Sequence, residues 1–231
     1  MFGIDTEYNP DRFKEMIISQ QYDWDCWLAA IRTILKMYDE HEYDSLSVLQ
    51  QLVQILQREN LRYSNIQGGY FVYIPLVLYY MGIDVELYIP HSLVPEMYNK
   101  ELSLQICTEI EANSVSLLSP RKYLFHCLSR ILMLGIPVKI VETCLPIMQE
   151  RLTKNCDAIV QVPCSDYYGV DNDSAGHTLI LTVDSGHHVV LDVFQERLEI
   201  AYCNASLCIQ HVMQYNWNSW NGWLCLCKRK S

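Results

Sequence analysis

The sequence predicts one α+β domain in which N-terminal helices pack on a C-terminal antiparallel sheet. Two patterns support this fold class. Over the first half of the chain, apolar residues recur at spacings of three and four, which is typical of amphipathic helices. The second half contains short apolar runs that are partly β-branched, as strands are. Because no Gly/Ser-rich linker interrupts the 231 residues, we expect a single domain over residues 19–231, preceded by an extension over residues 1–18.

Several segments carry the apolar stripe of a helix. We predict helices over residues 27–37, 47–56, 71–81, 123–134, 145–152 and 207–213. Asp25 precedes the first of them and belongs to a residue type that favours the capping position. Gly82 and Gly135 follow two others, at the position where a glycine commonly ends a helix.

Apolar and alternating runs predict the strands of the sheet. They lie at residues 84–89, 137–141, 157–162, 177–183, 189–194 and 223–227. A hairpin turn is predicted between Asp184 and His187. If the two residues between them form the turn, Asp192 lies opposite Leu179 and shares a face of the sheet with His177. Diagonal neighbours on one face are about 7–8 Å apart, within reach of a hydrogen bond between a carboxylate and an imidazole.

Charge and hydropathy exclude several classes of partner. The formal charge is −10, from 27 acidic against 17 basic residues, and no dense basic cluster is present. We therefore expect neither nucleic acid nor a membrane surface as a partner. The longest apolar run, residues 70–83, is shorter than the roughly 20 residues that span a bilayer. No leader follows Met1, so a cytoplasmic location is expected.

The ten cysteines are the unusual feature of the composition. In a cytoplasmic chain they are expected to be reduced thiols rather than a disulfide framework. No Cys-x-x-Cys occurs, and the closest pairs are Cys225-x-Cys227 and Cys203-x4-Cys208, so we expect no metal site. The sequence contains neither of the two common glycine-rich phosphate-binding motifs, Gly-x-x-x-x-Gly-Lys and Gly-x-Gly-x-x-Gly. We therefore expect no cofactor. Most of the cysteines are interpreted as small apolar packing residues.

Cys26 is the cysteine that carries a functional hypothesis. It opens the first predicted helix, where the macrodipole and free backbone N–H groups favour the nucleophilic thiolate. Gln20 lies six residues upstream, and its side-chain amide would form an oxyanion hole with the backbone N–H of Cys26. The alternative is that Cys26 is only a small buried residue, because Asp23 and Asp25 oppose thiolate formation.

The hairpin supplies a candidate base and a group to orient it. His177 begins one strand, and Asp192 lies inside the apolar run of its partner strand, where a charged residue needs a reason. Alternatively, Asp192 faces solvent and His177 is a histidine with no catalytic role. Taken with Cys26, the two residues complete a set of nucleophile, base and orienting acid, which favours the catalytic interpretation.

These residues also carry a resemblance to a known family. Residues 20–29, QQYDWDCWLA, resemble the start of the guanylyl cyclase domain-containing proteins, which are related to the papain-like, bacteriocin-processing (double-glycine) cysteine peptidases. The similarity continues through residues 73–82, 138–162, 176–181 and 203–206. It spans most of the chain, from about residue 20 to residue 227, and its specific parts are the Trp-Asp-Cys and Gly-His segments.

The resemblance implies a papain-like fold and a thiol hydrolase of peptide, isopeptide or related amide bonds. It implies that Cys26 is the nucleophile, His177 the base, Asp192 the orienting acid and Gln20 the oxyanion donor. The expected partner is a peptide or protein substrate, and a monomer is favoured. Asp192 is not followed shortly by the proline that is frequent in the family, and Trp27 replaces the family's usual glycine.

Two other functions stay open. The family name suggests a guanylyl cyclase, which would need metal-binding carboxylates and a triphosphate site, and the sequence contains no such constellation. The third hypothesis is a catalytically silent binding module with the same fold. Trp27 crowding the cleft, together with Asp23 and Asp25 beside the thiol, would suit such a module.

Overall fold

A computed structural model describes about half of the chain. The described residues are 15–19, 25–39, 43–59, 61, 71–90, 120–141, 150–152, 156–163, 176–184, 187–193, 198–199 and 224–228. They form a mixed α/β structure, in agreement with the predicted α+β class. The predicted helix over residues 207–213 lies outside the described residues, and of the one over residues 145–152 only residues 150–152 are described, as helix.

Four longer helices lie in the described part of the chain. They are α2 (Cys26–Asp39), α3 (Ser45–Arg58), α4 (Tyr73–Tyr80) and α6 (Pro120–Met133). Their bounds confirm four of the predicted helices to within a few residues. None of the helices within the described ranges is long and apolar enough to cross a bilayer.

The strands form one seven-stranded sheet in the order β2-β1-β7-β3-β4-β5-β6. They are β1 (Asp84–Pro90), β2 (Val138–Val141), β3 (Cys156–Pro163), β4 (Gly176–Asp184), β5 (His187–Asp192), β6 (Leu198–Glu199) and β7 (Leu224–Lys228). The two-residue β6 has no pattern that predicts it.

The prediction of a purely antiparallel, C-terminal sheet is wrong in one respect. Strand β1 comes from the first half of the chain but belongs to the same sheet, and it pairs in parallel with β2. The connection between them contains α6, and a crossover of this length returns the chain in the same direction. The other pairings of the sheet are antiparallel, as predicted.

Helices α4 and α6 end in the same way and deliver β1 and β2 to the sheet. Gly82 after α4 has φ 83°, and Gly135 after α6 has φ 77°, a backbone region that glycine adopts without a steric cost. The next amide donates to the carbonyl five residues back, at 2.9 Å for Ile83 and 3.2 Å for Ile136. This is the Schellman arrangement, and it confirms both glycines as the predicted helix ends.

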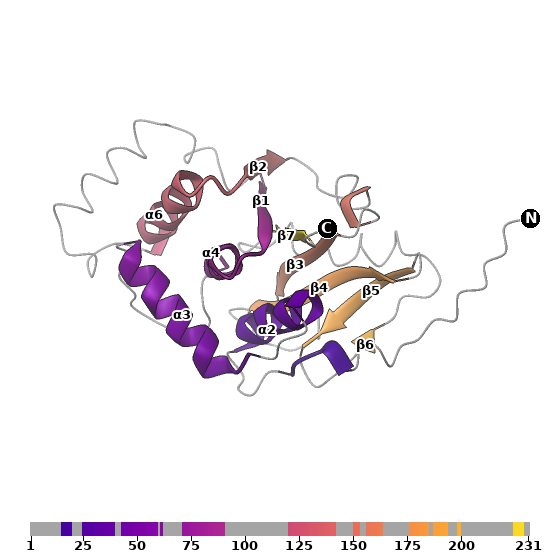
Figure 1. The fold of residues 1–231 in the computed structure, drawn as a ribbon. Coiled ribbons are helices and arrows are strands. Elements are labelled where there is room, and N and C mark those ends of the chain that lie inside the picture. Colours follow the sequence, from indigo (N-terminus) through magenta and orange to yellow (C-terminus); the bar gives the residue numbers. More distant parts are fainter. Residues whose placement is uncertain are drawn as a thin grey trace, which may run out of the picture.

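The sheet has a core on each face. Figure 1 shows the four helices gathered on one side of it, with α2 lying across β4. Sheet residues packed with the helices are Val85, Leu87, Ile89, Ile159, Ile180, Val189, Leu191, Val193, Cys225 and Cys227. The opposite face carries a smaller cluster: Tyr88, Leu152, Cys156, Ala158, Val160, Leu179, Leu181, Val190, Leu224 and Leu226. At the end of the predicted extension, Ile18 is buried and its N–H donates to Thr33 Oγ1 of α2 at 3.0 Å.

Three cations surround a buried carboxylate of the sheet. Glu86 of β1 is 5% exposed and pairs with Lys139 of β2 at 3.0 Å, with Arg151 at 2.6 Å, and with Lys228 of β7. The hydroxyl of Tyr88 donates to the same carboxylate at 3.1 Å. Burial raises the pKa of Glu86, but hydrogen bonds from the three cations outweigh it and lower the pKa to about 2.

We expect Glu86→Gln to lower the free energy of unfolding at pH 7 by about 1–2 kcal/mol. The pKa shift alone implies more, but the three cations are partly exposed and water screens them. Because the folded pKa lies below the ordinary 4.5, the stabilisation is complete above pH 4.5 and is lost as pH falls toward about 2.

Urea unfolding at pH 7 and at pH 3 measures this difference. The control is Asp84→Asn, an exposed residue on the same strand, which should change stability little. A loss for Glu86→Gln that is as large at pH 3 as at pH 7 would contradict the assignment of the effect to this carboxylate.

Candidate active site

The N-terminus of α2 presents the candidate nucleophile. The helix begins at Cys26, and the carbonyl of Asp25 accepts the first helical hydrogen bond from Ala29 N–H at 3.0 Å. Cys26 therefore lies in the first turn, where backbone N–H groups have no partner within the helix and the dipole is positive. Its side chain is nearly buried, with 7% of its residue surface exposed.

The β4–β5 hairpin has the predicted register. Asp184 lies opposite His187, and Asp192 lies opposite Leu179. Since side chains alternate along a strand, His177 and Leu179 share a face, and Asp192 shares it with them. The structure brings His177 Nε2 to 2.7 Å from Asp192 Oδ1. The expected hydrogen bond between imidazole and carboxylate is therefore present.

Both members of this pair are buried, His177 at 4% exposure and Asp192 at 0%. A buried carboxylate is costly unless it is paired, so the contact accounts for a charged residue inside an apolar strand. The alternative in which Asp192 faces solvent is wrong. Since the bond to Asp192 uses Nε2, a hydrogen bond between the imidazole and the thiol has to use the other ring nitrogen, Nδ1.

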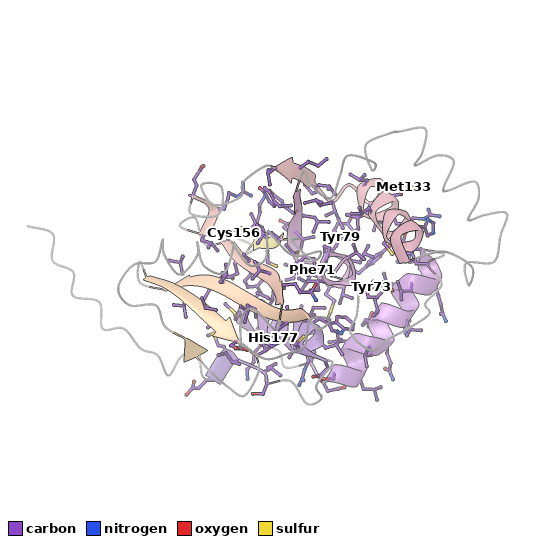
Figure 2. All side chains as sticks on the ribbon, turned by 180° about the vertical axis from the view of Figure 1, so that it is seen from behind. Phe71, Tyr73, Tyr79, Met133, Cys156 and His177 are labelled. Atoms are coloured by element: carbon purple, nitrogen blue, oxygen red, sulfur yellow. The ribbon has the colours of Figure 1, made fainter. Side chains whose placement is uncertain are left out.

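Cys26 and His177 favour each other's charged forms. Burial raises the pKa of Cys26, but the hydrogen bond and the charge of His177 outweigh it, and the net pKa is lowered. Burial lowers the pKa of His177, whereas hydrogen bonds to Asp192 and Cys26 raise it, to about 9 in total. The lowered pKa of Cys26 and the raised pKa of His177 both favour a thiolate–imidazolium pair. The pair lies where α2 meets β4, and Figure 2 labels His177 in this region.

Thr178 is a third neighbour of the sulfur. Its Oγ1 accepts a hydrogen bond from Cys26 Sγ at 3.6 Å, and the residue is fully buried. As the next residue after His177 on β4, it points to the helix side of the sheet. No sequence pattern singles it out, because a threonine within an apolar β-branched run is an ordinary strand residue.

Trp27 is a buried core residue, contrary to the hypothesis that it crowds the cleft. It is 3% exposed and belongs to the core between the helices and the sheet. Its ring packs against Tyr73 of α4, with 6.3 Å between ring centroids. The residue after the candidate nucleophile is therefore a packing residue that anchors the start of α2.

The remaining predicted site residues divide in two groups. Gln20 and Asp23 lie outside the described residues. Asp25 is described and is 1% exposed. Within the described ranges, no group of three or more His, Cys, Asp and Glu side chains is arranged to hold a metal ion.

The other described cysteines differ from Cys26. They are buried thiols, as predicted for packing residues: Cys127, Cys156, Cys225 and Cys227. Burial raises the pKa of Cys156 and that of Cys227. The pKa of Cys26 moves in the opposite direction because of its histidine. A perturbed thiol beside a perturbed imidazole is typical of a functional site.

Comparison of the chain with protein-family models, with curated proteins and with solved structures yields no significant match. The resemblance to the guanylyl cyclase domain-containing proteins therefore stays a prediction.

Proposed function

We propose that this chain is a thiol hydrolase that cleaves a peptide, isopeptide or related amide bond. The observation that carries the proposal is the buried set of Cys26, His177 and Asp192, with an imidazole–carboxylate distance of 2.7 Å. The lowered pKa of the thiol and the raised pKa of the imidazole support it. A nucleophile, a base and an orienting acid are the groups that this chemistry requires.

In the first half of the proposed reaction, the Cys26 thiolate attacks the carbonyl carbon of the scissile bond. The resulting oxyanion accepts a hydrogen bond from the backbone N–H of Cys26, in the first turn of the helix. Gln20 is proposed as the second donor, a contribution of roughly 3–4 kcal/mol for such groups. The C–N bond then breaks, and the leaving amine takes the proton from His177.

In the second half, water attacks the acyl thioester and gives its proton to His177. The C–S bond breaks, and the carboxylic acid product leaves with the thiolate restored. Throughout, Asp192 holds the imidazole by its Nε2–H, so that Nδ1 faces the sulfur.

We also propose that the mixed α/β fold is papain-like. Support comes from the position of its two reactive parts: the thiol begins a helix, and the base begins a strand of the sheet packed against that helix. An arrangement of this kind places the nucleophile and base on separate rigid elements, which keeps their geometry fixed.

Cleavage of cellular peptides tests the proposal. We expect the wild-type protein, incubated with a peptide extract, to generate new C-termini detected by mass spectrometry. Cys26→Ala is expected to lower this cleavage at least 1,000-fold, because loss of the nucleophile removes the covalent route. The same variant should retain bound substrate in a pull-down.

Cys156→Ala is the matched control, because it removes another buried free thiol from the opposite face of the sheet. Figure 2 labels Cys156 apart from His177. Cleavage should survive this change. Turnover of GTP that survives Cys26→Ala, with no peptide cleavage, would instead favour the cyclase hypothesis, and a folded protein with inert Cys26 would favour the binding module.

A further inference from the structure

We propose that Thr178 is a positioning residue that holds the Cys26 sulfur toward His177 and donates a hydrogen bond from its hydroxyl to the thiolate. This inference rests on the proposed function, because it assigns a further role within the same site. The observation behind it is the 3.6 Å contact between Cys26 Sγ and Thr178 Oγ1.

Thr178 is held rigidly enough for this role. It is fully buried and lies inside β4, where its backbone pairs with Gln161 of β3. A β-branched side chain in a strand has few rotamers, so its hydroxyl occupies a defined place relative to the sulfur. The side chain of Cys26 rotates about a single bond, and a fixed hydroxyl restricts that rotation.

A hydroxyl suits both protonation states of the pair because it donates and accepts. When Cys26 is a thiol, its S–H donates to Thr178 Oγ1, as the structure has it. When the proton moves to His177, the hydroxyl rotates and its O–H donates to the thiolate. No heavy atom has to move, and the sulfur stays beside the imidazole in both states.

His177 and Thr178 have different partners because side chains alternate along a strand. His177 and Thr178 are consecutive and therefore point to opposite faces of the sheet. The imidazole uses Nε2 for Asp192, while the threonine faces α2 with Ile180. Both residues interact with Cys26, Thr178 through its hydroxyl and His177 through its imidazole.

The test is the pH dependence of Cys26 alkylation in Thr178→Val and Thr178→Ser. Valine keeps the shape and removes the hydroxyl, so we expect the apparent pKa of Cys26 to rise by about one unit. Serine keeps the hydroxyl and should restore at least half of that shift. Thr182→Val, a buried threonine farther along the same face of β4, is the control and should leave the Cys26 profile unchanged.

The outcomes separate this inference from the proposed function. A lowered wild-type pKa that Thr178→Val leaves unchanged overturns the role of Thr178 alone. A shift that serine fails to restore also overturns it, because packing rather than the hydroxyl would then be responsible. A wild-type profile of an ordinary thiol overturns both proposals.

Discussion

His177→Ala is expected to slow the alkylation of Cys26 by iodoacetamide at neutral pH at least tenfold. The imidazolium is the main group that lowers the pKa of Cys26 against the effect of burial. An adjacent opposite charge typically shifts a pKa by about 1–3 units, which is a 10- to 1,000-fold change in thiolate population near neutral pH. The rate is measured by mapping the alkylated peptide with mass spectrometry.

His126→Ala is the control, because it removes a buried histidine of α6, distant in sequence from the hairpin. Its alkylation rate at Cys26 should match the wild type. Thermal unfolding of each variant establishes that the fold is kept. An unchanged rate in folded His177→Ala would show that the imidazole does not activate the thiol.

Asp192→Ala is expected to lower the free energy of unfolding by about 3–5 kcal/mol. It leaves His177 buried and without its carboxylate, and breaking a buried pair from one side costs this much. Asp192→Asn should cost less, because an amide oxygen still accepts a hydrogen bond from Nε2–H. Both changes are expected to lower the pKa of His177 from about 9, which an NMR titration of the imidazole measures.

A double-mutant cycle separates the pair from simple packing. When His177→Ala is added to Asp192→Ala, no buried imidazole is left uncompensated, and the double variant should be more stable than the sum of the single losses predicts. Additive losses would mean that the contact between the two residues contributes nothing of its own. Urea unfolding of the four proteins gives the four free energies.

Local patterns predicted most of the described fold. The apolar stripes and the two glycines were sufficient for the helices because each depends on neighbouring residues alone. The pairing of β1 with β2 was not predictable in this way. Parallel pairing is set by where a distant crossover places the strand, and no residue within β1 or β2 encodes its partner.

The candidate site was predictable for a different reason. The short turn between Asp184 and His187 sets the hairpin register, so counting residues was enough to place Asp192 beside His177. Thr178 and the position of Trp27 depend on how α2 packs against the sheet and on α4, which are long-range contacts. Sequence spacing contains no information about these contacts.

The pH dependence of Cys26 alkylation in the wild-type protein shows whether this thiol is activated. We expect an apparent pKa of Cys26 below the ordinary thiol value of 9.0, and faster alkylation of Cys26 at neutral pH than of the buried Cys156 and Cys227. An apparent pKa for Cys26 at or above 9.0, in a protein that is folded, would contradict an activated thiol and the hydrolase built on it.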